Sequence, residues 1–142
     1  FSQMFANQKR GWIIFLSSIV AFQGVPYASN YAATKAYIQS FAEALAIELK
    51  PYGVDVLSAS PAPVASGFGK RANMKMDKAM KPEDISVPIL KALGKESNVL
   101  PGVLSKVLTY ALRTVPRWVR VRIMQKVMGG FTKHQRELEL TS

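Results

Sequence analysis

A tyrosine and a lysine stand four positions apart in a stretch that reads as a helix. They are Tyr31 and Lys35 in the sequence YAATK, and one helical turn would place both side chains on the same face. A free phenol titrates at about pH 10, which makes it a poor acid or base at neutral pH. Because a nearby ammonium favours the phenolate, we expect Lys35 to lower the pKa of Tyr31. Tyr31 could then exchange a proton with a carbonyl or alcohol oxygen. The alternative is a surface tyrosine beside a solvated lysine.

A serine upstream is a third candidate for chemistry. Ser18 ends the apolar run GWIIFLSS and precedes Tyr31 by thirteen positions. If this run is a strand, Ser18 lies at the carboxyl edge of a sheet, where open α/β sheets bind ligands. Its hydroxyl could donate a hydrogen bond to a substrate oxygen and stabilise developing charge. Ser17 is the alternative, since its side chain would point to the other face of the strand. Either serine could instead cap a loop or a helix.

The elements around these residues form a recognisable unit. Residues 11–18 are rich in β-forming residues and have the length of a strand that is buried on both faces. Residues 31–50 are rich in Ala, Leu and Glu, and they predict a long helix, with Ser29 or Asn30 as its N-cap. Residues 54–60 predict a second strand. A strand, a helix and a strand in this order predict a βαβ unit with a parallel sheet.

The last third of the chain has a different character. From Gly102 to His134 there are seven Lys or Arg and no Asp or Glu, with Leu and Val at helical spacing. This pattern predicts one or two basic amphipathic helices, broken at Pro116. We therefore divide the chain into residues 1–102 and a basic helical tail over 103–142. The tail could pack on the core with a solvated basic face, or lie on an anionic membrane surface. Nucleic-acid binding is not expected, because the tail lacks an aromatic stacking platform.

Ser18, Tyr31 and Lys35 together resemble the motif of the short-chain dehydrogenase/reductase family, a serine about thirteen residues before Tyr-x-x-x-Lys. The stretch SASPAPVASGF resembles that family's Pro-Gly-x-Val-x-Thr loop. The resemblance implies an α/β fold with a Rossmann-like, doubly wound parallel sheet. It also implies NAD or NADP as cofactor and a small-molecule substrate that alternates between carbonyl and alcohol. It covers residues 11–69, and more loosely the chain to residue 102, which corresponds to the C-terminal half of the family's domain.

The resemblance also implies roles for individual residues. Ser18, Tyr31 and Lys35 would be catalytic, and the tyrosine and the lysine would also contact the cofactor, the lysine through the nicotinamide ribose.

A loop would complete the cofactor site. Pro61, Val64 and Ser66 would lie against the nicotinamide carboxamide, and the backbone of Val64 would bond to it. Ala62 stands where the family usually has glycine. If that position requires a positive φ, alanine would cost about 1 kcal/mol there.

The family's other motifs do not occur in the chain. The glycine-rich nucleotide loop Thr-Gly-x-x-x-Gly-x-Gly and the Asn-Asn-Ala-Gly strand are both missing from the sequence. We therefore expect a fragment of a protein of nearly twice this length. Taken alone, such a fragment should be inactive, should bind cofactor weakly, and should form a homo-oligomer that covers its exposed sheet edge.

Composition narrows the remaining possibilities. The chain has 142 residues, enough for one domain core, and a net charge of +10. It has no cysteine and one histidine, His134, so no metal site is expected. No apolar run is long enough to span a membrane, and we expect a cytoplasmic protein, membrane-associated if the tail binds lipid. The methionines of the stretch NMKM suit an apolar substrate, although the stretch could instead be an ordinary, partly disordered loop. The Leu and Val residues of the tail favour a lipid-like substrate, and hence lipid metabolism. The alternative functions are a membrane-surface or interaction module and an inactive fragment.

Overall fold

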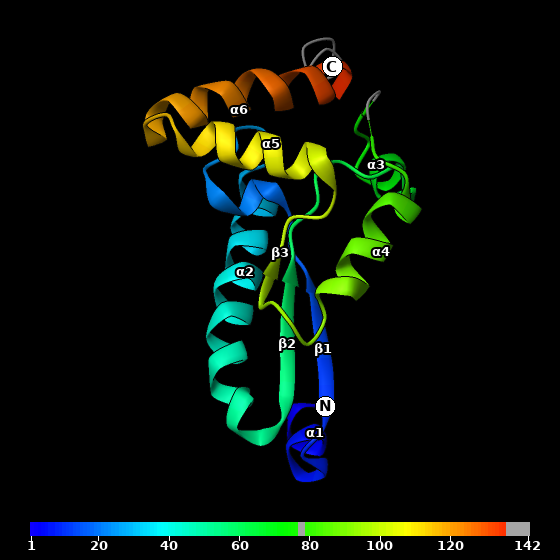
Figure 1. Ribbon diagram of the computed structural model, residues 1–142. Coiled ribbons are helices and arrows are strands. Elements are labelled where there is room, and N and C mark those ends of the chain that lie inside the picture. The colour runs from blue at the N-terminus through cyan, green and yellow to red at the C-terminus, as the bar shows by residue number, and fades with distance from the viewer. Residues whose placement is uncertain (77–78, 136–142) are drawn as a thin grey trace.

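The computed structural model describes residues 1–76 and 79–135 (Figure 1). The helices and strands are α1 (Ser2–Gln8), β1 (Gly11–Leu16), α2 (Ser29–Leu49), β2 (Val54–Ala59), α3 (Gly67–Arg71), α4 (Pro82–Ala92), β3 (Asn98–Val99), α5 (Gly102–Arg113) and α6 (Arg117–Phe131). Two short 3-10 turns, η1 (Ile19–Phe22) and η2 (Lys50–Tyr52), follow β1 and α2. The last residues of the predicted tail, 136–142, lie outside the described residues.

The three strands form one parallel sheet in the order β1-β2-β3. Gly11 pairs with Val54 and Leu16 with Ala59, so β1 and β2 are in register along their whole length. Figure 1 shows α2 on one side of the sheet, α4 on the other, and α5 and α6 across the carboxyl ends of the strands. The predicted βαβ unit and parallel α/β fold are confirmed.

Helix α2 meets the sheet through small and polar side chains. Its buried residues are Ala32, Gln39, Ala42 and Ala46, and the alanines allow the helix to approach β2 closely. Gln39 accepts hydrogen bonds from the hydroxyls of Ser58 and Ser60, at 2.7 and 2.8 Å. Its own amide donates to Glu43 at 2.7 Å. This buried network ties the middle of α2 to the end of β2.

Strand β1 is buried on one face only, so the prediction of two buried faces is wrong. Ile13 and Phe15 pack against the alanines of α2. The opposite face, Trp12, Ile14 and Leu16, is exposed. The reason is geometric: α4 packs against the part of the sheet formed by β2 and β3, and no element of the described residues covers this face of β1.

Two helix ends can be compared with the sequence predictions. The N-cap of α2 is Ala28, and neither Ser29 nor Asn30 caps it, because the helix already begins at Ser29. Pro116 is the N-cap of α6 and separates it from α5, where the sequence predicted a break. None of the helices in residues 1–76 and 79–135 combines the length and the hydropathy that crossing a membrane requires.

Candidate active site

The two serines after β1 point to different partners. The backbone N–H of Ser17 donates to the carbonyl of Ala59 at 2.8 Å, and its hydroxyl donates to the carbonyl of Lys35 at 2.9 Å. The two hydrogen bonds of Ser17 therefore connect the end of β1 to β2 and to α2. The hydroxyl of Ser18 instead caps η1, accepting from the N–H of Val20 at 3.4 Å and donating to the carbonyl of Pro61 at 3.5 Å, and it lies close enough to the phenol of Tyr31 to lower the pKa of that group. Of the two serines, it is Ser18 that meets the tyrosine.

Burial dominates the acidity of Tyr31. It raises the pKa of the phenol above its ordinary value, and the hydrogen bond from Ser18 opposes this by stabilising the phenolate. The ring of Phe68 lies against the Tyr31 ring, with 5.2 Å between the centroids. The phenol is therefore protonated throughout the neutral range.

The expectation that Lys35 lowers the pKa of Tyr31 is wrong. The Lys35 ammonium lies 5.7 Å from the centroid of the Tyr31 ring and donates to the carbonyl of Leu16 at 2.7 Å. The cation therefore faces the ring and is bound elsewhere, and the pKa of the phenol is governed by burial, which raises it, and by Ser18, which lowers it. Burial also lowers the pKa of Lys35 itself. The two residues do share one face of α2, as their spacing predicted.

The backbone of the loop after β2 is hydrogen-bonded to the backbone of Met80. The N–H of Met80 donates to the carbonyl of Pro63 at 2.8 Å, and the N–H of Ala65 donates to the carbonyl of Met80 at 2.7 Å. The Val64 N–H between them has no partner among the hydrogen bonds of the described residues. Ser66 caps α3, because its hydroxyl accepts from the N–H of Phe68 at 3.4 Å.

Ala62 fits its position without strain. The non-glycine residues with positive φ in the described residues are Lys9, Tyr27 and Asn73, so the cost expected for alanine does not arise. The N–H of Ala62 donates to the hydroxyl of Ser105, on α5, at 2.8 Å. Sequence reasoning missed Ser105. The available signal was a pair of hydroxyl residues, Ser105 and Thr109, at helical spacing in the predicted basic amphipathic helix.

A cavity of about 480 Å³ brings the predicted residues together. One wall holds every predicted site residue: Ser18, Tyr31, Lys35, Pro61, Val64 and Ser66, with Ser17 beside them. The opposite wall is apolar, and α5, α6 and the loop after α3 supply it: Met74, Met76, Leu104, Leu108, Leu112, Ile123, Met124, Val127, Met128 and Phe131. The predicted site residues and a set of apolar side chains therefore line the same cavity.

The end of α6 is bonded to the loop that closes this cavity. His134 Nε2 donates to the side-chain oxygen of Asn73 at 3.0 Å, and the Gln135 amide donates to the carbonyl of Asn73. The N–H of Lys75 donates to the carbonyl of Phe131 at 3.1 Å. His134 therefore contacts the loop of residues 72–75.

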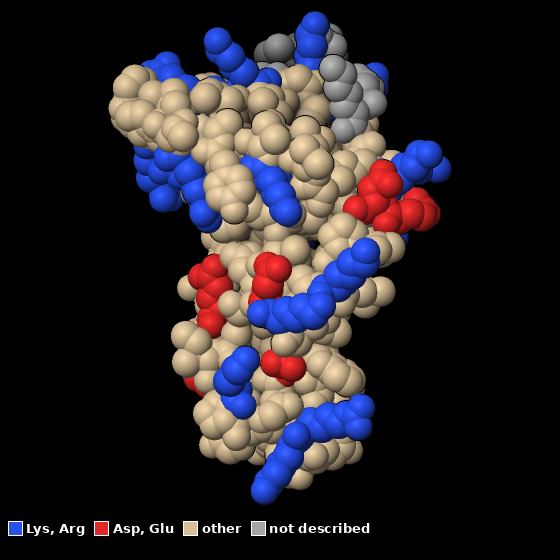
Figure 2. All heavy atoms as spheres, in the orientation of Figure 1, with Lys and Arg blue, Asp and Glu red and all other residues tan. Residues whose placement is uncertain are grey.

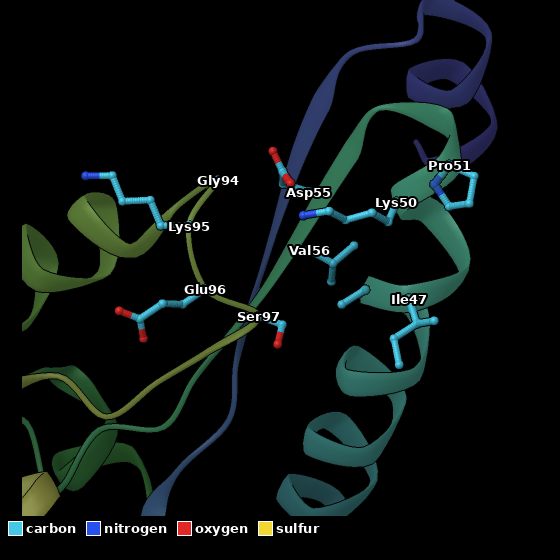
Figure 3. A pocket seen from close by; sticks show the side chains of 10 residues that line it. Ile47, Lys50, Pro51, Asp55, Val56, Gly94, Lys95, Glu96 and Ser97 are labelled. Carbon is cyan, nitrogen blue, oxygen red and sulfur yellow. The ribbon is translucent and has the colours of Figure 1, made fainter.

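A second cavity, of about 520 Å³, lies at the other end of the sheet, near the start of β2 (Figure 3). Charged residues on its walls include Lys50, Asp55, Lys95 and Glu96. Figure 3 shows the Lys50 side chain extending toward Asp55, while Lys95 points away. No predicted site residue lines this cavity, so we place the candidate site in the cavity that contains Tyr31.

Comparison with known proteins places the chain in a family. Residues 1–77 match the family model described as short chain dehydrogenase. A 7beta-hydroxysteroid dehydrogenase of Collinsella aerofaciens is 31% identical over 113 residues, which are 75% of this chain and 43% of that protein. The chain thus spans less than half the length of this relative.

Solved structures show the same fold. A structure described in work on 7beta-hydroxysteroid dehydrogenase stereoselectivity superimposes with a TM-score of 0.74 and 28% identity, over 86% of this chain and 49% of that one. A short chain dehydrogenase from Burkholderia cenocepacia in complex with NADP gives a TM-score of 0.71 at 22% identity, over 86% of this chain and 50% of that one. The chain is a member of the short chain dehydrogenase family.

Proposed function

We propose that these residues form the catalytic half of an NAD(P)-dependent oxidoreductase that interconverts a carbonyl and an alcohol. The observation that carries the proposal is that the Ser18 hydroxyl lies beside the Tyr31 phenol at the carboxyl end of β1, inside a cavity. Two neighbouring hydroxyl groups can both hydrogen-bond to a single substrate oxygen when it enters the cavity. This is the arrangement that protonation of a carbonyl oxygen requires.

Tyr31 and Ser18 would have different roles in the reaction. Tyr31 is protonated at neutral pH, as an ordinary phenol is, and burial moves its pKa further upward, so it can donate its proton to the carbonyl oxygen as negative charge develops there. Ser18 would hold the same oxygen in place. In the reverse direction Tyr31 would accept the alcohol proton as a phenolate, and the Ser18 hydrogen bond stabilises that form.

The residues present fit the nicotinamide end of the cofactor. Bound NAD(P) would supply the hydride that adds to the substrate carbon or leaves it. In this chain Lys35 and Tyr31 would contact the adjoining ribose, and Pro61, Val64 and Ser66 the carboxamide. The Val64 N–H supports this assignment, because it is a backbone donor in the cavity wall with no partner among the described residues.

The apolar wall supports an apolar or lipid-like substrate. Leu, Ile, Val, Met and Phe side chains from α5 and α6 face the catalytic groups, and they would exclude water from the reacting oxygen. A relative named 7beta-hydroxysteroid dehydrogenase aligns with 75% of this chain, and a steroid is an apolar molecule. We therefore place the substrate among hydrophobic ketones and alcohols, steroid ketones included.

The decisive experiment replaces Tyr31 with Phe in the complete polypeptide that carries this sequence. Reduction of a steroid ketone with NADPH or NADH should fall by about 10²–10⁴-fold, the usual contribution of a general acid. Tyr37→Phe is the matched control, because Tyr37 lies on the same helix and is exposed. If Tyr31→Phe keeps the activity of the Tyr37→Phe control, Tyr31 is not the proton donor and the proposal fails.

A further inference from the structure

Helix α5 carries apolar side chains on two faces. Leu104, Leu108 and Leu112 line the catalytic cavity, and the buried positions between them are Ser105 and Thr109, both of them polar. Val103, Val107 and Tyr110 lie on another face and are 78%, 57% and 58% exposed. An amphipathic helix normally turns its apolar side chains toward the core, so this outward apolar stripe is a separate surface. Three large apolar side chains on one outer face need a partner that is itself apolar.

Basic side chains border this apolar stripe. Lys106 and Arg113 are exposed on α5, and the Arg113 guanidinium lies 6.0 Å from the centroid of the Tyr110 ring. Arg117 and Arg122 follow on α6, and both are exposed. Residues 102–135 include no Asp or Glu at all. The partner should therefore carry negative charge around an apolar interior.

Another exposed residue of this region, a tryptophan, is of the type that membrane interfaces favour. Trp118, in the first turn of α6, is 68% exposed and is separated from the end of α5 by a short turn. Trp and Tyr are enriched where a polar surface meets hydrocarbon, because each joins an apolar ring to a hydrogen-bonding group.

Figure 2 shows the charge distribution on this side of the molecule. The surface over α5 is largely uncharged, basic groups gather at its left end and along the top, and acidic groups lie lower down and to the right. A second copy of the chain is a poor partner, since two such basic faces would repel each other. A lipid surface with anionic headgroups satisfies both the charge and the apolar stripe.

We propose that the docking face, formed by Val103, Val107, Tyr110 and Trp118 with the cations around them, binds the surface of an anionic phospholipid bilayer. On the same helix Leu104 and Leu108 line the catalytic cavity. The docking face therefore adjoins the apolar wall of the cavity, although the docking itself does not depend on the proposed reaction.

The test uses vesicles and the fluorescence of one tryptophan. The chain has two tryptophans, so Trp12→Gln leaves Trp118 as the reporter and also makes the exposed face of β1 more polar. This variant should sediment with vesicles of phosphatidylcholine and phosphatidylglycerol in equal parts, with a blue shift of the emission. It should not sediment with phosphatidylcholine alone, and high salt should release it.

Introducing a negative charge into the apolar stripe provides the matched comparison. Val103→Glu should weaken binding to the anionic vesicles by at least tenfold, whereas Ile47→Glu, at an α2 position with the same 78% exposure, should not. Neutralising Arg117 to Gln should weaken binding roughly fivefold. Circular dichroism checks that every variant remains folded.

Several results would overturn the proposal. Equal binding to both kinds of vesicle would remove the role of headgroup charge, and equal losses in Val103→Glu and Ile47→Glu would remove the role of this helix. A dimer that Val103→Glu dissociates would assign the face to a second copy. Binding to a single-stranded oligonucleotide but not to the anionic vesicles would assign it to nucleic acid.

Discussion

The hydroxyl of Ser18, thirteen positions before Tyr31 in the sequence, lies beside the Tyr31 phenol at the carboxyl end of β1 and lowers its pKa. The Ser18 hydroxyl and the burial of the phenol act on this pKa in opposite directions, and burial is the larger influence. Ser18 therefore lowers the pKa of Tyr31, whereas burial raises it. Removing either influence should shift the titration of Tyr31 in a known direction.

Replacing Ser18 with Ala should raise the pKa of Tyr31 further, because the phenolate loses a hydrogen-bond donor. The measurement is the phenolate absorbance during an alkaline titration, with the Tyr31→Phe curve subtracted to isolate this tyrosine. Ser17→Ala is the control, since that hydroxyl donates to the carbonyl of Lys35 and not to the phenol. A Ser18→Ala curve that shifts to lower pH would contradict the assigned hydrogen bond.

The raised pKa of Tyr31 also predicts how stability responds to alkali. The folded state holds this proton more tightly than the unfolded chain, whose tyrosine titrates at about 10. The contribution is fully present below that value and is lost as pH rises through the higher pKa of the folded state. Urea unfolding in an alkaline pH series should show the wild type losing stability relative to Tyr31→Phe. A constant difference between the two proteins would show that burial does not perturb this phenol.

Gln39 should be among the residues most important to stability. Replacing it with Leu removes the acceptor of two hydroxyls, Ser58 and Ser60, that are themselves fully buried. Unpaired buried hydroxyls should lower the free energy of unfolding by roughly 2–4 kcal/mol, as measured by urea denaturation. Gln125→Leu, at an exposed position of α6, should change it by less than about 0.5 kcal/mol. Similar losses in the two variants would mean that the network contributes nothing specific.

Ser105 should position the loop after β2. In Ser105→Ala the N–H of Ala62 loses its acceptor in a buried site, so its hydrogen exchange should accelerate while exchange within β1 and β2 stays slow. Ser86→Ala is the control, because Ser86 is an exposed α4 residue whose hydroxyl bonds within its own helix turn. Unchanged exchange at Ala62 would show that the loop keeps its place without α5.

The parts of the site that were predictable are those that depend on local spacing. A strand ending near Ser18 and a helix carrying Tyr31 and Lys35 follow from patterns within single elements, and the structure places all three on one cavity. The contact between Ser105 and Ala62 joins residues 43 positions apart, and no local pattern encodes it. The acidity of Tyr31 depends on burial by distant residues, which is why its direction was mispredicted.

The same distinction applies to the helix and the strand of the βαβ unit. Residue type suggested that β1 would be buried on both faces, but burial of a strand depends on what covers it. In α2, the polarity of Gln39 would predict an exposed side chain. Its burial is favourable only because the hydroxyls of Ser58 and Ser60, at the end of β2 and just after it, donate hydrogen bonds to it.

The exposed face of β1 predicts self-association of the 142-residue chain. Trp12, Ile14 and Leu16 form an apolar row on an edge strand, which is the kind of surface that pairs with another copy. Leu16→Lys should reduce the concentration-dependent sedimentation of the chain, because a charge in this row opposes its burial. Leu90→Lys is the matched control on α4, since Leu90 is 62% exposed and Leu16 is 58% exposed. If Leu90→Lys dissociates the oligomer and Leu16→Lys does not, the contact lies on the α4 side and the β1 row is not the interface.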